Sequence, residues 1–404
     1  MKKYNRFNIL LLSLVATVII SSCSKDSDNN EQPVHSWYVS AEQKGGLTQQ
    51  AMQTMATLGG FSAFVPMVNY DVQLRKVTYH TEYPAGTPVL ASGMLVMPAT
   101  VSDKLPIVVY MHGTVATGGE PSASITHAET LLCAIMASSF GCVVLLPDYI
   151  GYGASDDIVH PYIHKESLGQ AGLDFIRAYQ EYAAEEGAPF TNRVMLTGYS
   201  EGGYAAVALQ KKIQETPAAG LKIEKAIAGS GPYDNVNFGK TFLATDAACD
   251  AHFISSYLWG IQMYKDCYGY AKSYADIFSA VDNAKLQARN YDMAYFRPDE
   301  YELSTNPAQL FQQSFRLDVA ADADTDFLRV LGENSLTDFA PQDSLILVYG
   351  SADTWVYPLN SINAYDAMHD KGCKVALVSI EGGDHSSTML PYCNVVLNRL
   401  QLFE

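Results

Sequence analysis

The chain has 404 residues, of which 48% are hydrophobic and 17% are charged, and its formal net charge is −17 at pH 7. This composition excludes disorder over most of the chain and allows a large hydrophobic core. Its length suits one α/β domain with a large insertion, although length alone does not separate one domain from two. Because an acidic chain repels phosphate backbones, we expect no nucleic-acid partner.

The start of the chain predicts a lipoprotein signal peptide. A basic segment, KKYNR, precedes the apolar residues 7–20, a run shorter than the roughly 20 residues that a membrane-spanning helix needs. The run ends in ISSC, which resembles a bacterial lipobox with Cys23 as the lipidated residue. We therefore expect residues 1–22 to be removed and residues 23–35 to form a flexible tether. The expected localisation is that of an exported bacterial lipoprotein, anchored at Cys23 in the outer membrane or at the cell surface; an ordinary signal peptide is the alternative.

Six cysteines remain besides Cys23. An exported protein can form disulfides, and Cys249 and Cys267 lie close together in a segment without strand signals, so we expect these two to pair. No CxxC motif or cysteine–histidine cluster has the spacing of a zinc site. We expect neither a metal ion nor an organic cofactor.

From Val72 onward, short apolar runs alternate with segments of helical pattern. Two runs that flank PAGT, residues 84–87, predict an antiparallel hairpin. Six later runs are apolar on both faces, as buried parallel strands must be. They are residues 105–113, 142–151, 193–200, 223–231, 344–353 and 374–385. Helices are expected near residues 124–138, 166–185, 202–215, 359–370 and 386–400. The alternation predicts an α/β fold with a mostly parallel, doubly wound sheet that binds ligands at the carboxyl ends of its strands.

One long segment interrupts this alternation. Residues 232–341 are rich in Tyr and Phe, show helix-like patches and contain no convincing strand. Because an unstructured loop of that length is unusual inside a compact domain, we expect a helical cap insertion over the site. Helices packed elsewhere on the molecule are the alternative. The two parts of the α/β core are then residues 36–231 and 342–404.

The sequence GYSEG, residues 198–202, fits the G-x-S-x-G nucleophile elbow. An apolar run precedes it and a helical pattern rich in small residues follows, so the chain must turn sharply at Ser200, where the glycines leave room for neighbouring backbone. A serine hydroxyl is a weak nucleophile. It needs a histidine as base and an acid that orients the histidine.

Asp353 and His385 follow the last two predicted strands. The chain order Ser, Asp, His is the order that accompanies this elbow. We therefore expect Ser200, Asp353 and His385 to form a catalytic triad. Asp234 and Asp384 are the alternative acids.

The tetrahedral intermediate of acyl transfer needs amide donors for its oxyanion. We expect one donor to be the N–H of Glu201, directly after the nucleophile. We expect the second to be Thr114, which follows the apolar run of residues 105–113.

The motifs HGT, LPDYIGYG, GYSEGGYAA, YGSADTWV and GGDH, in this order, resemble those of the α/β-hydrolase superfamily over residues 72–402. The stretches LPDYIGYGAS, GLDFIRAYQEY, GYSEGG and AIAGSGPYD are similar to the secretory lipase family and its bacterial esterase relatives. This resemblance implies an α/β-hydrolase fold with a helical lid after the sixth strand. It also implies a carboxylic ester hydrolase with Ser200, Asp353 and His385 as its triad.

The expected function is a serine carboxylic ester hydrolase, esterase- or lipase-like, that acts on a small-molecule ester without a cofactor. A serine peptidase of the same fold remains open, and it would need acidic groups in its pocket to bind a substrate amine. A catalytically silent surface binding lipoprotein also remains open, because a fold does not fix a function.

Overall fold

The computed structural model describes residues 36–100, 104–116, 119–121, 128–187, 190–295 and 302–400. The chain from His35 to Glu404 forms one compact unit. The predicted signal peptide, the lipobox cysteine and the tether lie outside the described residues. Among the helices of the described part, none is both long and apolar enough to cross a membrane.

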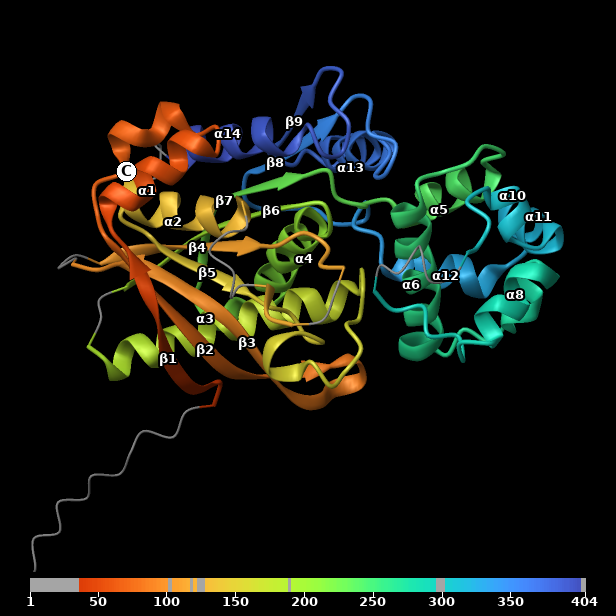
Figure 1. Cartoon of the computed structure of the whole chain (residues 1–404), viewed down its shortest axis with the longest axis horizontal. Coiled ribbons are helices and arrows are strands. Elements are labelled where there is room, and N and C mark those ends of the chain that lie inside the picture. Colours follow the sequence, from red (N-terminus) through yellow and green to blue (C-terminus); the bar gives the residue numbers. More distant parts are fainter. Residues whose placement is uncertain are drawn as a thin grey trace, which may run out of the picture. The chain divides into compact units, whose positions relative to one another are not determined.

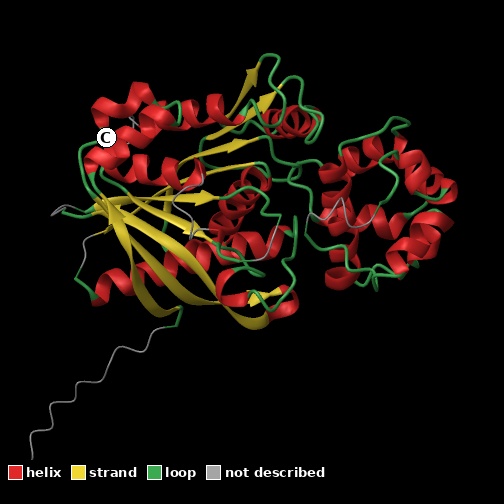
Figure 2. Ribbon diagram, viewed as in Figure 1, coloured by secondary structure: helices red, strands yellow, loops and turns green. Residues whose placement is uncertain are grey.

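A sheet with the strand order β1-β2-β3-β5-β4-β6-β7-β8-β9 forms the centre of this unit (Figures 1 and 2). The strands are β1 (Tyr38–Leu47), β2 (Val72–Tyr83), β3 (Thr87–Pro98), β4 (Leu105–Met111), β5 (Val143–Pro147), β6 (Phe190–Tyr199), β7 (Lys222–Gly229), β8 (Leu345–Gly350) and β9 (Val375–Ile380). The pairs β1–β2, β2–β3 and β3–β5 are antiparallel. All pairs from β5 to β9 are parallel. The predicted mostly parallel sheet and its opening hairpin are confirmed.

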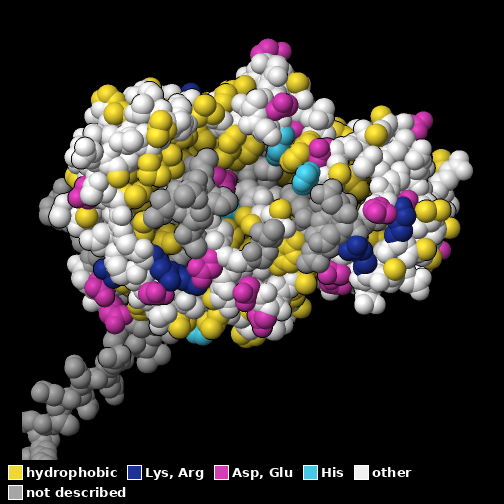
Figure 3. Space-filling model, in the orientation of Figure 1, with side chains coloured by type: hydrophobic (Ala, Val, Ile, Leu, Met, Phe, Trp, Pro, Cys, Tyr) yellow, Lys and Arg dark blue, Asp and Glu magenta, His cyan; other side chains and the backbone are white. Residues whose placement is uncertain are grey.

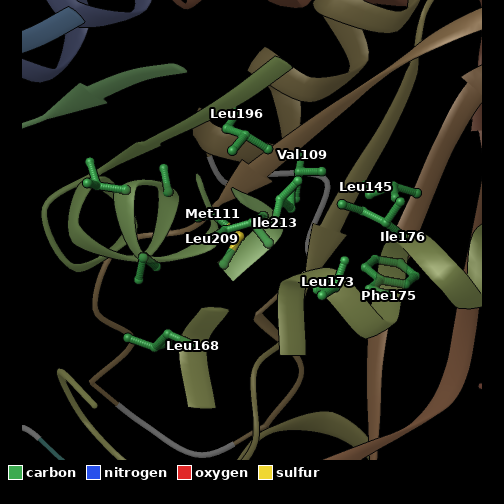
Figure 4. Packing of buried hydrophobic residues seen from close by; sticks show 14 of the residues in the cluster. Val109, Met111, Leu145, Leu168, Leu173, Phe175, Ile176, Leu196, Leu209 and Ile213 are labelled. Carbon is green, nitrogen blue, oxygen red and sulfur yellow. The ribbon is translucent and has the colours of Figure 1, made fainter. Parts of the chain in front are cut away.

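Helices cover both faces of the sheet (Figure 2). They are α1 (Gln49–Leu58), α2 (Ala128–Phe140), α3 (Lys165–Glu185), α4 (Glu201–Glu215), α13 (Leu359–Asp370) and α14 (Met389–Leu400). Side chains alternate between the two faces along each strand. Val109 and Leu145 belong to one apolar cluster with Phe175 of α3 and Leu209 of α4 (Figure 4). Val108 and Val144 point the other way and pack with α1, α2 and α14. The sheet is therefore doubly wound, as predicted.

The first strand and helix, β1 and α1, precede the region in which the sequence predicted regular structure. β1 pairs with β2 at the edge of the sheet, and most of its residues are exposed. An exposed edge strand needs neither an apolar run nor a regular alternation of apolar and polar residues. Its sequence therefore carries no strand signal.

The described part of the segment between β7 and β8 is mainly helical, and we call residues 232–341 the helical insertion. Its helices are α5 (Asn235–Ala244), α6 (Ala251–Tyr268), α7 (Tyr274–Ile277), α8 (Ala280–Gln287), α10 (Pro307–Leu310), α11 (Gln313–Ala320) and α12 (Thr325–Glu333). They share an apolar core of their own, which includes Phe242, Leu258, Phe315 and Phe327.

The expected disulfide between Cys249 and Cys267 is wrong. Both residues are free thiols, as are Cys133, Cys142, Cys373 and Cys393. Cys249 precedes α6 and Cys267 lies in the last turn of the same helix, so the helical rise separates them by about 24 Å. A disulfide requires Cα atoms within about 7 Å of each other. The two residues are close in sequence, but a straight helix fills the interval between them.

Candidate active site

Ser200 lies at the turn between β6 and α4, with φ of 59° and ψ of −123°. A positive φ is uncommon for a residue other than glycine, and such strained conformations cluster at functional sites. Two glycines make the turn possible. A Cβ atom at Gly198 would lie 2.2 Å from the carbonyl oxygen of Gly202, and one at Gly202 would lie 2.0 Å from the carbonyl oxygen of Met111. Any side chain at either glycine would force the neighbouring backbone away from the elbow.

His385 bridges Ser200 and Asp353. Its Nε2 lies 2.9 Å from Oγ of Ser200, and its Nδ1 lies 2.7 Å from Oδ2 of Asp353. Because an ionised carboxylate only accepts hydrogen bonds, Nδ1 carries the proton and the lone pair of Nε2 faces the serine hydroxyl. The structure thus brings together the three residues that follow β6, β8 and β9 in the sequence.

Backbone and side-chain groups hold both partners of this histidine–aspartate pair in place. The side chain of Asp353 is 1% exposed, and its Oδ1 accepts the N–H groups of Trp355 and Val356, each at 2.9 Å. These two bonds leave Oδ2 for the histidine. The Tyr199 hydroxyl donates to the carbonyl oxygen of His385 at 2.7 Å.

The two alternative acids have other partners. Asp234 is the N-cap of α5, where it accepts the N–H of Asn237, and its Oδ2 accepts the side-chain amides of Asn237 and Asn363. Asp384 is exposed and accepts the N–H and the hydroxyl of Ser387. Of the three candidate acids, Asp353 is the one hydrogen-bonded to the imidazole.

The two expected oxyanion donors, Glu201 and Thr114, both line the cavity that contains the nucleophile. Glu201 is the first residue of α4, so its N–H has no acceptor within the helix. Thr114 follows β4, and its hydroxyl oxygen lies 3.3 Å from that of Tyr162. A Cβ atom on the preceding Gly113 would lie 3.9 Å from the Cβ of Ser200. Both expected donors therefore belong to backbone close to the serine.

Glu129, which the sequence did not single out, supports the loop that carries Thr114. It lies in the first turn of α2, and its Oε1 accepts the N–H of Gly113 at 3.0 Å and the hydroxyl of Tyr110 at 3.1 Å. The partners belong to different elements. No local sequence pattern could therefore have revealed this contact.

A cavity of about 380 Å³ contains Ser200 in its wall. The rest of its lining is mainly apolar and aromatic, with Phe238, Phe253, Tyr257, Tyr264, Leu331 and Trp355 among its residues. α6 of the helical insertion supplies a large part of this wall. Gly260, on α6, faces open space, because a Cβ atom there would meet nothing within 4 Å. The cavity suits an apolar group attached to a polar reacting centre.

Burial raises the pKa of the Tyr162, Tyr257 and Tyr264 hydroxyls in this cavity well above the ordinary value. These hydroxyls stay neutral near pH 7 and can donate hydrogen bonds. Among the described side chains, no group of His, Cys, Asp and Glu could hold a metal ion.

The charge of the molecular surface differs from that of the cavity. The chain has 43 Asp and Glu residues against 26 Lys and Arg residues, and acidic side chains are scattered over the face drawn in Figure 3. Within the cavity lining, the carboxylate belongs to Glu201, whose Oε1 lies 2.8 Å from Nε2 of His160. Because Glu201 is only 1% exposed, the cavity presents little of this charge to a substrate.

Solved structures of bacterial and fungal hydrolases resemble this chain. A hydrolase from Legionella pneumophila matches with a TM-score of 0.80 at 22% identity, over 91% of this chain and 98% of that one. The rice cell wall degrading esterase LipA from Xanthomonas oryzae matches with a TM-score of 0.78 at 25% identity, over 91% of this chain and 99% of that one. The closed state of Candida antarctica lipase A matches with a TM-score of 0.62 at 16% identity, over 89% and 80%.

The sequence itself matches the model of the secretory lipase family over residues 117–393. No curated protein matches the sequence. The family match contains the elbow, the acid and the histidine described above, and the similar structures share the α/β-hydrolase fold. The chain therefore belongs to the secretory lipase family and is a hydrolase of the lipase and esterase type.

Proposed function

We propose that the protein is a serine carboxylic ester hydrolase that works through an acyl-enzyme on Ser200. The observation that carries the proposal is the unbroken line of hydrogen bonds from Asp353 through His385 to the serine hydroxyl. The strained elbow and the apolar cavity beside it support the same function.

In the first half-reaction, Oγ of Ser200 attacks the ester carbonyl carbon while its proton moves to Nε2 of His385. Asp353 stabilises the imidazolium and keeps Nδ1 protonated. The carbonyl oxygen becomes an oxyanion, which the N–H groups of Glu201 and Thr114 stabilise. When the intermediate collapses, the bond to the alcohol oxygen breaks and the imidazolium gives that oxygen its proton.

In the second half-reaction, His385 takes a proton from a water molecule as the water oxygen attacks the acyl-enzyme. The same two N–H groups stabilise the second oxyanion. Collapse breaks the bond to Oγ of Ser200, which recovers its proton from the imidazolium. The products are a carboxylic acid and an alcohol, and the enzyme returns to its starting state.

The helical insertion acts as a cap in this proposal, with boundaries at residues 232–341 between the core segments 36–231 and 342–404. Its support is the cavity lining, which includes α6 residues between His252 and Tyr264 together with Ser200. An apolar acyl group attached to Ser200 would extend between these residues. The cap therefore determines which acyl groups fit.

The alternative of a serine peptidase finds little support in the cavity. Recognition of a substrate amine needs a free acid near the nucleophile, and the lining carboxylate, Glu201, is 1% exposed and bound to His160. The alternative of a silent binding protein does not account for the complete hydrogen-bonded line from acid to serine.

The secretory description of the family agrees with an exported protein. We propose further that Cys23 carries a lipid anchor, on the support of the basic segment, the apolar run and ISSC. Metabolic labelling with palmitate should mark the unmodified protein and leave Cys23→Ser unlabelled. Equal labelling of both proteins would contradict the anchor.

The experiment that tests the proposed function compares Ser200→Ala with the unmodified protein on p-nitrophenyl butyrate. Loss of the nucleophile should lower kcat by more than about 10⁴-fold and leave the circular dichroism spectrum unchanged. Ser379→Ala is the control, because Ser379 is an exposed serine within β9 and does not line the cavity. Equal activity in all three proteins would exclude Ser200 as the nucleophile.

A further inference from the structure

Two polar side chains that the proposed mechanism does not use are buried together, and one of them belongs to Glu201, the residue after the nucleophile. His160 is 0% exposed and Glu201 is 1% exposed. Nε2 of His160 lies 2.8 Å from Oε1 of Glu201, and its Nδ1 lies 2.6 Å from the carbonyl oxygen of Ile150. Because a carbonyl oxygen only accepts, Nδ1 carries a proton, and one further proton lies between Nε2 and Oε1. Both ring nitrogens are thus engaged, and the ring has one orientation.

The local sequence brings His160 to this position. Gly151 has φ of 93°, and a Cβ atom on it would lie 2.4 Å from the Cα of His160. A larger residue at 151 would push the histidine away. The rings of Tyr149, Tyr152 and Trp259 enclose the imidazole at centroid distances of 5.7, 4.9 and 5.5 Å. Gly151 therefore has a structural role, the placement of His160, that the triad alone does not explain.

The backbone of the same histidine is bound to the helical insertion. Nε1 of Trp259, on α6, donates to the carbonyl oxygen of His160 at 3.2 Å. The indole also stacks on Tyr162, with ring centroids 4.6 Å apart and planes at 11°. The Tyr162 hydroxyl in turn lies 3.3 Å from the hydroxyl of Thr114. The loop of residues 160–162 thus contacts both proposed oxyanion residues on one side and α6 on the other.

This arrangement matters because oxyanion donors act only where they are already aimed at the developing charge. The N–H of Glu201 belongs to the first turn of α4, and the side chain of the same residue is the one that His160 holds. A displacement of about 1 Å in a reacting geometry can cost a factor of about 100 in rate. A contact that fixes this turn is therefore able to affect kcat without touching the substrate.

We propose that His160 is a positioning residue that couples α6 of the helical insertion to the oxyanion donor Glu201. The imidazole holds the Glu201 carboxyl group and with it the first turn of α4. Trp259 holds the backbone of His160 from the side of the insertion. This inference rests on the proposed function, and its test separates the two.

The test compares His160→Asn with His160→Gln. An asparagine amide reaches the position of Nδ1 and keeps the contact with Ile150, but it leaves the Glu201 carboxyl group without its partner. A glutamine amide reaches the position of Nε2 and can still donate to that carboxyl group. We expect kcat on p-nitrophenyl butyrate to fall about 10- to 100-fold in His160→Asn with KM nearly unchanged, and to recover most of this loss in His160→Gln.

Two controls accompany these variants. His164→Asn replaces another buried histidine of the same loop, which caps α3 through its contact with Ser167, and it should keep kcat. Trp259→Phe preserves the stacking on Tyr162 but removes the N–H that binds His160, and it should lower kcat about three- to tenfold. All rates are expressed per serine that reacts with a fluorophosphonate, so misfolded protein does not count.

A second measurement reports on the oxyanion site itself. A trifluoromethyl ketone forms a tetrahedral adduct with the serine, and its oxygen occupies the oxyanion position. The affinity for this ketone should fall in His160→Asn by about the same factor as kcat/KM, because both depend on the same stabilised charge. A merely structural loss of folded protein would not change the affinity of the remaining active sites.

Unchanged kcat and unchanged ketone affinity in folded His160→Asn overturn the inference and leave the proposed function intact. Equal losses in the Asn and Gln variants, or a higher KM at constant kcat, overturn it as well. If His160→Asn does not fold, the Trp259→Phe variant provides the test. Full activity in that variant overturns the proposed coupling between α6 and Glu201. If the unmodified protein neither hydrolyses the ester nor reacts with the fluorophosphonate, the proposed function itself fails.

Discussion

Replacement of Asp353 by Asn reverses a single hydrogen bond in the proposed triad. Oδ1 of Asp353 accepts the N–H groups of Trp355 and Val356, so the oxygen of an asparagine must take that place. Its NH₂ group then faces Nδ1 of His385, where Oδ2 now accepts a hydrogen bond. An NH₂ group only donates. The imidazole must therefore place its proton on Nε2, where it points at Ser200 and cannot act as a base.

The size of the effect follows from this change of tautomer. The same replacement in a serine protease triad lowers kcat about 10⁴-fold, which corresponds to about 5.4 kcal/mol of transition-state stabilisation. The structure predicts a loss of this order here, because the N–H groups of Trp355 and Val356 hold the asparagine oxygen and prevent the side-chain amide from flipping. Since the asparagine oxygen still accepts both N–H groups, the fold should persist, and KM should change little.

The assay measures kcat and KM for p-nitrophenyl butyrate in Asp353→Asn and in Asp384→Asn. Asp384 is exposed and bonds Ser387, so its replacement serves as the control and should leave kcat within about twofold. A loss of less than tenfold in Asp353→Asn, or a larger loss in Asp384→Asn, would refute the assignment of the acid.

Three further predictions concern the cavity, a buried histidine and the thiols. Gly260→Leu fills open space in the cavity. If the leucine excludes three methylene groups of an acyl chain, kcat/KM for p-nitrophenyl octanoate should fall about 50-fold, at roughly 0.8 kcal/mol per methylene. The value for p-nitrophenyl acetate should fall much less, and equal losses for both esters would refute this. Burial lowers the pKa of His164 to about 4 from 6.5, so the unfolded chain binds the proton first as the pH falls. The free energy of unfolding should therefore fall by up to roughly 3 kcal/mol from pH 6.5 to pH 4, and urea titrations should show a smaller fall in His164→Asn. Cys249 and Cys267 are free thiols, so a reducing agent should leave the midpoint of thermal unfolding unchanged, and a decrease would contradict their free state.

The parallel strands and the elbow were predictable because their signals are local. A buried parallel strand such as β5 must be apolar on both faces, and it is completely buried. The elbow requires glycines at positions 198 and 202, since a Cβ atom at either would meet backbone closer than 3 Å. Local packing demands of this kind appear directly in the sequence.

Contacts between distant elements were not predictable in the same way. The bond from His160 to Glu201 joins residues 41 positions apart, and Glu129 reaches the loop after β4 from the start of α2. Neither pair follows a periodic pattern. The expected Cys249–Cys267 bridge failed for the related reason that distance along the chain does not give distance in space when a helix lies between.

Mass spectrometry of the protein after reaction with a fluorophosphonate tests the proposed nucleophile most directly. The proposed function predicts one adduct, on Ser200, in the tryptic peptide of residues 194–211. The adduct should be absent from Ser200→Ala and should form far more slowly in His385→Ala, because the base no longer activates the hydroxyl. An adduct on another residue, or none on the active protein, would contradict the proposed role of Ser200.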